Sequence, residues 1–138
     1  MNTTGYEFLA ADLMTVEPVV IAVDAPVEEA QRLLIEYEVS GLPVVDPSGA
    51  LVGVISQTDF MHLGDPDVGN LIRHKPSGIK VGEVMSRPAV TVVLSTTLRE
   101  AARTMIDERV HRVVVIDDRQ RPIGVLSAMD FVKLYAED

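Results

Sequence analysis

Apolar residues recur at two spacings along the chain, and the same order of spacings occurs twice. Short runs rich in β-branched residues predict strands at residues 19–23 and again at residues 89–93. After each run the apolar residues lie three and four positions apart, which predicts an amphipathic helix with one buried face. The residues of this face are Val27, Ala30, Leu33, Leu34 and Tyr37 in the first copy and Leu98, Ala101, Ala102, Met105 and Ile106 in the second.

Two more apolar runs follow each helix and predict a pair of strands joined by a turn. In the first copy they are residues 42–45 and 51–55, with Asp-Pro-Ser-Gly between them, and in the second they are residues 113–116 and 122–126. A last short helix begins at Ser56 or at Ser127. Each copy is therefore predicted to run β-α-β-β-α, which places the chain in the α/β (α+β) class.

The two copies are also similar in amino-acid sequence. The stretch Gly-Val-Ile-Ser-Gln-Thr-Asp-Phe that starts at Gly53 returns as Gly-Val-Leu-Ser-Ala-Met-Asp-Phe from Gly124, 71 positions later, and the same offset relates Met14 to Met85. We divide the chain into a first repeat with its N-terminal leader (1–63), a connector (64–79) and a second repeat (80–138). A unit of about 50 residues buries too little surface to be stable alone, so the copies are expected to share an interface. The basic run Arg73-His74-Lys75 in the connector is either a solvated loop or an aid in holding an anionic ligand.

Composition narrows the functional classes. The 138 residues carry a formal net charge of −9, which disfavours binding to nucleic acid but leaves a small anionic ligand open. The absence of cysteine excludes disulfides and thiolate zinc sites, and it favours a cytoplasmic location. The apolar runs are far shorter than the roughly 20 residues that span a bilayer, and residues 1–9 do not resemble a signal peptide, so no membrane association is expected.

The series Val-Met-Ser-Arg-Pro-Ala-Val-Thr-Val, His-Arg-Val-Val-Val-Ile-Asp and Ile-Gly-Val-Leu-Ser-Ala-Met-Asp-Phe in the second repeat resembles the cystathionine-β-synthase (CBS) domain. Two such repeats in tandem resemble a Bateman module. The resemblance implies two repeats packed about a pseudo-twofold axis with two clefts between them. It also implies that no cofactor is required and that an adenosine compound (AMP, ADP, ATP or S-adenosylmethionine) binds in those clefts. A homodimer and a separate effector protein are the partners that it suggests.

The first candidate binding residues lie where a strand passes into the last helix of the first repeat. The Asp59 carboxylate can accept hydrogen bonds from two ribose hydroxyls, and the hydroxyls of Ser56 and Thr58 can meet a phosphate together with backbone N–H groups. The same spacing, Ser-x-x-Asp, is also a helix-capping arrangement. The family resemblance places a ribose-binding aspartate at Asp59, and both roles can coexist.

The second repeat keeps Ser127 and Asp130 but has Met129 where the first has Thr58, so the two clefts are not expected to be equivalent. The pair His111-Arg112 lies just ahead of the strand predicted at residues 113–116 and offers hydrogen-bond donors for a phosphate, whereas the first repeat has Ser40-Gly41 there. The alternative is a surface pair that forms a salt bridge with Asp107 or Glu108.

The sequence shows no nucleophile paired with a base, no Walker-type Gly-Lys-Ser/Thr stretch and no histidine spacing typical of zinc. We therefore expect a regulatory, non-enzymatic module without a metal site, which senses an adenosine ligand. A ligand-free dimerisation or scaffold protein is the alternative.

Overall fold

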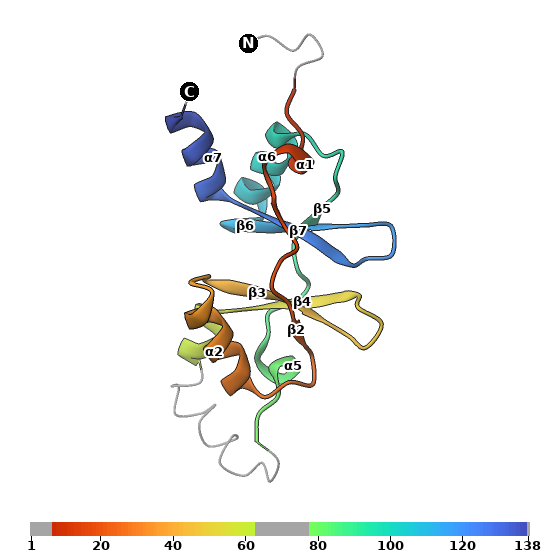
Figure 1. Cartoon of the computed structure of the whole chain (residues 1–138), viewed down its shortest axis with the longest axis vertical. Helices are drawn as coiled ribbons and strands as arrows, with labels where there is room; N and C mark the ends of the chain where they lie inside the picture. Colours follow the sequence, from red (N-terminus) through yellow and green to blue (C-terminus); the bar gives the residue numbers. More distant parts are fainter. Residues whose placement is uncertain (1–6, 63–77, 138) are drawn as a thin grey trace. The chain divides into compact units, whose positions relative to one another are not determined.

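The computed structural model describes residues 7–62 and 78–137 (Figure 1). Both copies follow the predicted β-α-β-β-α order, and short additional elements precede each of them. The helices are α1 (Ala10–Leu13), α2 (Val27–Glu36), α3 (Gln57–His62), α5 (Val81–Val84), α6 (Leu98–Glu108) and α7 (Ala128–Ala136). The strands are β1 (Thr15–Val16), β2 (Ile21–Ala22), β3 (Gly41–Val45), β4 (Leu51–Ser56), β5 (Thr91–Val92), β6 (Arg112–Ile116) and β7 (Pro122–Ser127).

The described residues form two compact units whose limits differ from those of the repeats. Residues 7–18 and 90–137 belong to one unit, called unit 1 here, and residues 19–62 and 78–89 belong to the other, unit 2. Unit 2 is thus one stretch of chain, whereas unit 1 is assembled from both ends. The division of the sequence into 1–63, 64–79 and 80–138 describes the repeat and is not the division in space. Most of the connector, with its basic run Arg73-His74-Lys75, lies outside the described residues.

Unit 1 contains a four-stranded sheet in the order β1-β7-β6-β5. Strand β7 pairs antiparallel with both β6 and β1, and β5 runs parallel to β6. Helices α1, α6 and α7 lie on one face of this sheet (Figure 1). Alternate residues of β6 enter the core beneath the helices because successive strand side chains point to opposite faces. The core consists of Ala10, Val92, Leu98, Ala101, Met105, Val113, Val115 and Leu126.

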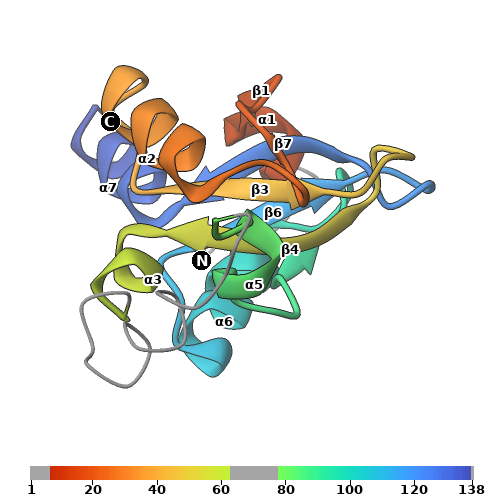
Figure 2. The same ribbon diagram turned by 90° about the horizontal axis from the view of Figure 1, so that it is seen from below.

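Unit 2 contains a three-stranded sheet in the order β2-β3-β4, with β2 parallel and β4 antiparallel to β3. Helices α2, α3 and α5 are seen beside β3 and β4 in Figure 2. The core repeats the pattern of unit 1 and consists of Ile21, Ala30, Leu34, Leu42, Val44, Ile55 and Val81. Two residues assigned from periodicity to a buried helix face are in fact exposed: Tyr37 (51%), which lies past the end of α2, and Ile106 (71%), which lies in the last turn of α6.

The leader of each repeat packs on the strands of the other repeat. The Met14 side chain lies against Gly124, so closely that a Cβ at that position would overlap the sulfur, and Met85 lies in the same way against Gly53, where a Cβ would stand 2.7 Å from Sδ. Hydrogen bonds hold these segments in place, among them Val81 N to Ala25 O at 2.8 Å. Each unit is therefore built from segments of both repeats.

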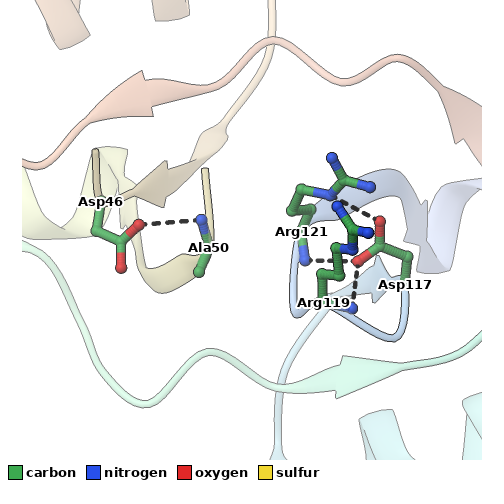
Figure 3. Close-up of polar contacts among 5 residues, drawn as sticks. All are labelled: Asp46, Ala50, Asp117, Arg119 and Arg121. Carbon is green, nitrogen blue, oxygen red and sulfur yellow. Dashed lines mark hydrogen bonds and ion pairs between the residues drawn. The ribbon is translucent and has the colours of Figure 1, made fainter. Parts of the chain in front are cut away.

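Aspartates close the two hairpins (Figure 3). Asp46 Oδ1 accepts a hydrogen bond from Ala50 N at 3.1 Å, and Asp117 Oδ1 accepts from Arg119 N and Arg121 N, each at 2.9 Å. Arg121 Nε adds a bond to Asp117 Oδ2 at 2.9 Å. The hydroxyl of Ser48 is the main cause that lowers the pKa of Asp46, and the backbone N–H of Arg121 is the main cause for Asp117. The turns predicted at both places are confirmed.

Candidate functional site

In unit 2 the end of β4 and the start of α3 bring Ser56, Thr58 and Asp59 together. Asp59 Oδ2 accepts hydrogen bonds from Ser56 N at 2.8 Å and from the Ser56 hydroxyl at 3.3 Å. Asp59 Oδ1 accepts a third bond, at 2.7 Å, from the hydroxyl of Ser86 in the leader of the second repeat. The Asp59 residue is only 6% exposed, whereas Thr58 is exposed. Both carboxylate oxygens of Asp59 therefore already accept hydrogen bonds within unit 2, and Oδ2 caps the start of α3.

In unit 1 the end of β7 and the start of α7 place Ser127 and Asp130 in the same relation. Asp130 Oδ2 accepts from Ser127 N at 2.8 Å, and Asp130 N donates to the Ser127 hydroxyl at 3.3 Å. Met129 is 58% exposed beside them, at the position that Thr58 occupies in unit 2. Capping is reciprocal here, since each residue bonds the backbone of the other.

The two aspartates differ in their second oxygen. The position in unit 1 that matches Ser86 is Thr15, which lies opposite Val125 just as Ser86 lies opposite Val54. No hydrogen bond joins Thr15 to Asp130, and Asp130 Oδ1 has no partner among the residues that the structure describes. Asp130 is also partly exposed. Asp130 thus keeps one free acceptor oxygen that Asp59 lacks.

Arg112 and Ser127 face each other across the β6–β7 pair, and Ala128 N donates to His111 O at 2.7 Å. The structure therefore brings four of the predicted residues, His111, Arg112, Ser127 and Asp130, to one end of the unit 1 hairpin. His111 and Arg112 have different surroundings. His111 is exposed and lines a groove between α6 and α7, whereas Arg112 is half-buried, and its burial lowers the pKa of its guanidinium.

Unit 2 has no basic pair at the equivalent place. Ser40 and Gly41 occupy it, with Gly41 opposite Ser56 and Gln57 N donating to Ser40 O at 3.1 Å. A buried arginine is a strong donor to an anion because a phosphate would replace the hydration that burial removes from the guanidinium. Among residues 7–62 and 78–137, the end of the β6–β7 pair in unit 1 thus combines cationic side chains with a carboxylate that has a free oxygen, and the equivalent end of unit 2 does not.

Sequence reasoning missed Ser86. The signal was present, because the 71-residue offset aligns Ser86 with Thr15, so that both leaders carry a hydroxyl directly after a methionine. The hydroxyl bonds the aspartate in one unit only, and this depends on side-chain geometry rather than on residue type. Among residues 7–62 and 78–137 no three His, Asp or Glu side chains are grouped so that they could hold a metal ion, and no helix there is long and apolar enough to cross a membrane.

The family model of the CBS domain matches residues 10–64 and 81–137. This chain is a CBS domain protein. The solved structure of CBSX2 in complex with AMP resembles it with a TM-score of 0.82 and 31% identity, covering 94% of this chain and 97% of that one. The CBS domain pair of MJ0100, solved with 5′-methylthioadenosine and S-adenosyl-L-methionine, gives a TM-score of 0.77 at 26% identity over 92% and 98% of the two chains.

Among curated proteins, the inosine-5′-monophosphate dehydrogenase of Methanocaldococcus jannaschii is 32% identical over 127 residues. The match covers 92% of this CBS chain but only 22% of the dehydrogenase. The chloroplastic CBSX2 of Arabidopsis thaliana is covered over 57% of its length. The chain thus spans less than two thirds of the length of both relatives.

Proposed function

We propose that the chain is a regulatory module that binds an adenosine compound, such as AMP, ADP, ATP or S-adenosylmethionine, and passes the signal to an effector protein or to its own oligomer. The observation that supports this most is the free Oδ1 of Asp130 beside His111, Arg112 and Ser127. Similar proteins have been solved with AMP or with S-adenosyl-L-methionine, which favours the adenosine class. We further propose that the module is non-catalytic, requires no cofactor and acts in the cytoplasm.

In this proposal Asp130 Oδ1 accepts a ribose hydroxyl while Oδ2 remains the helix cap. The Arg112 guanidinium and the His111 ring supply donors for phosphate, and the backbone N–H groups at the start of α7 add to them. At Asp59 a ribose hydroxyl would first have to displace the hydroxyl of Ser86 from Oδ1. We therefore propose a stronger site at the Asp130 end and a weaker one involving Ser56, Thr58 and Asp59.

The test is calorimetric titration of the full chain with adenosine, AMP, ADP, ATP and S-adenosylmethionine, each with and without magnesium. The change Asp130→Asn keeps the shape of the side chain but removes the charge. It is expected to weaken binding by about 1.5–3 kcal/mol, the usual contribution of a hydrogen bond to a charged group, or roughly 10–100-fold. Asp59→Asn is the matched variant and should leave the tighter site unchanged. Loss of binding in Asp59→Asn alone would contradict the assignment.

A scaffold protein without a ligand is the second candidate. It is favoured by Met129, which removes a hydroxyl, and by the engagement of both Asp59 oxygens within unit 2. Failure of every compound in the titration series to bind would support it.

A further inference from the structure

Each unit carries a groove between two of its covering helices, and equivalent positions line the two grooves. The groove of unit 2, between α2 and α3, has a volume of about 550 Å³, and that of unit 1, between α6 and α7, has about 600 Å³. Every lining residue of one groove lies 71 positions from its counterpart in the other. Four of the eight positions are apolar in both grooves, for example Leu34 with Met105 and Phe60 with Phe131. The other four positions differ in chemistry, and they indicate what the groove of unit 1 binds.

The floor of the unit 1 groove is more apolar than that of unit 2. Two glutamines of unit 2 correspond to two alanines of unit 1, and the pairs are Gln31 with Ala102 and Gln57 with Ala128. Unit 1 thus lacks two polar side chains that would lose their hydration against an apolar ligand. Met105 is 6% exposed, and its unbranched thioether side chain adapts readily to the shape of an apolar neighbour. This floor suits a hydrocarbon chain.

One end of the groove is basic in unit 1 and acidic in unit 2. Arg109 and His111 line it in unit 1, at the positions that Glu38 and Ser40 occupy in unit 2. The fold does not require the arginine, because Glu38 has the same left-handed backbone as Arg109, with φ of 53° and 57°. Within the part of the chain that the structure describes, the Arg109 guanidinium and the His111 ring have no hydrogen bond or salt bridge, and no acidic side chain lines this groove. This end therefore offers unpaired donors to an anion.

We propose that the groove of unit 1 binds a medium-chain carboxylate, the anion of an unbranched fatty acid with about eight to ten carbons. The carboxylate accepts hydrogen bonds from Arg109 beside His111, and the chain lies along α6 over Met105 toward Ala102. Ala102 precedes Arg109 by seven residues, or about 10 Å of helix. A zigzag chain of about eight to ten carbons with single bonds of about 1.5 Å spans this distance. In unit 2 the negative charge of Glu38 would repel the same ligand.

The test is calorimetric titration of the full chain with decanoate, 1-decanol and decylammonium, at concentrations below those at which they form micelles. The formal net charge of −9 attracts the decylammonium cation overall, so a preference for decanoate can come only from local cations. Decanoate should bind about tenfold more tightly than decylammonium, with decanol between them. Each buried methylene contributes about fourfold in affinity, so octanoate should bind roughly tenfold more weakly than decanoate. Dodecanoate should gain little, because its chain extends past the groove.

Two variants test the two parts of the groove. Arg109→Gln removes the charge and should weaken decanoate about three- to fivefold at low salt while decanol is unaffected. Ala102→Gln gives unit 1 the residue of unit 2 and should weaken both decanoate and decanol about tenfold, because the new side chain fills the floor. Gln31→Ala is the matched control in unit 2 and should leave both affinities unchanged. Circular dichroism checks that each variant is folded.

Nuclear magnetic resonance of chains labelled at the methionine methyl groups locates the ligand. Decanoate should shift the Met105 signal, which is assigned with Met105→Leu, and should leave that of Met61 on α3 unchanged. The proposal is overturned if decanoate does not bind, if decylammonium binds as tightly, or if the Met105 signal does not move. Equal affinities for decanol and decanoate would also overturn it, since they would indicate an apolar surface of the kind that another protein covers.

The proposal does not rest on the adenosine site. Asp130, on which that site depends, does not line the groove. AMP titrated into the same preparation tests the adenosine site separately, and Ala102→Gln should leave its affinity unchanged. Failure of one ligand to bind is therefore distinguishable from failure of the other.

Discussion

Replacement of Asp59 should destabilise the protein more than replacement of Asp130, although both residues cap a helix at equivalent positions. Removing a cap costs about 1 kcal/mol. Asp59→Ala also removes the bond from the Ser86 hydroxyl to a carboxylate that is 6% exposed, which adds about 1.5 kcal/mol. The expected losses are therefore about 2.5 kcal/mol for Asp59→Ala and about 1 kcal/mol for Asp130→Ala.

Thermal unfolding followed by far-ultraviolet circular dichroism measures this difference without a ligand. At about 4 °C per kcal/mol for a chain of this size, the Asp59→Ala midpoint should lie about 6 °C below that of Asp130→Ala. Ser86→Ala alone should remove the extra 1.5 kcal/mol or so and should cost little when added to Asp59→Ala, because the two changes break the same bond. Thr15→Val is the matched control and should cost little.

Equal midpoints for the two aspartate variants would refute this reasoning, and so would additive losses from Asp59→Ala and Ser86→Ala. Either result would mean that the Ser86 bond does not stabilise unit 2. The distinction drawn between the two aspartates as ligand acceptors would then lose its basis.

Three further predictions concern packing, acid stability and the ligand's phosphate. Gly53→Ala should destabilise the chain by about 1–3 kcal/mol in denaturant titration, because the new Cβ would stand 2.8 Å from the backbone oxygen of Ser86; an unchanged midpoint would contradict this close approach. The pKa values of Asp46 and Asp117 are lowered, so the folded state favours the charged carboxylates. Their contribution to the stability of the fold is complete above about pH 4, the pKa of an unfolded aspartate, and it is lost as the pH falls through the lower pKa of the folded state. Asp117→Asn should therefore reduce the loss in free energy of unfolding between pH 4 and lower pH, measured by denaturant titration at several pH values. An unchanged pH dependence would contradict a stabilising role of the Asp117 charge. In calorimetry, Arg112→Ala should weaken the binding of ATP more than that of AMP and leave the binding of adenosine nearly unchanged. Equal losses of affinity for all three compounds would exclude a contact between Arg112 and phosphate.

The repeat and its helices could be predicted because burial imposes a period on the sequence. The face of α2 that packs on its sheet includes Val27, Ala30 and Leu34, which the spacing had indicated. Helices of four residues, such as α1 and α5, are too short to show a period. The exchange of leaders is a long-range contact, and the only local sign of it is the repeated Met14 and Met85.

The candidate site was predicted as a set of residue types, and the structure adds what each atom does. The Ser-x-x-Asp spacing favours capping and the family resemblance adds ligand binding, so the sequence could not separate the two roles. The structure shows how the two aspartates differ: the hydroxyl of Ser86 occupies one oxygen of Asp59, whereas the matching oxygen of Asp130 has no partner among the described residues. The separate surroundings of His111 and Arg112 follow from the start of β6 at Arg112, one residue before the start predicted from the apolar run.

The discontinuity of unit 1 has a consequence for synthesis on the ribosome. Unit 2 has all its strands once residue 89 has left the ribosome, so it can close while the rest of the chain is still being made. Strand β1 emerges before any part of unit 2, but it pairs Thr15 with Val125 and must wait for β7, more than a hundred residues later. During that interval Met14 lacks the glycine on which it packs. Nascent chains should therefore gain protease resistance in two steps, first in residues 19–62 and 78–89 and only after β7 has emerged in residues 7–18.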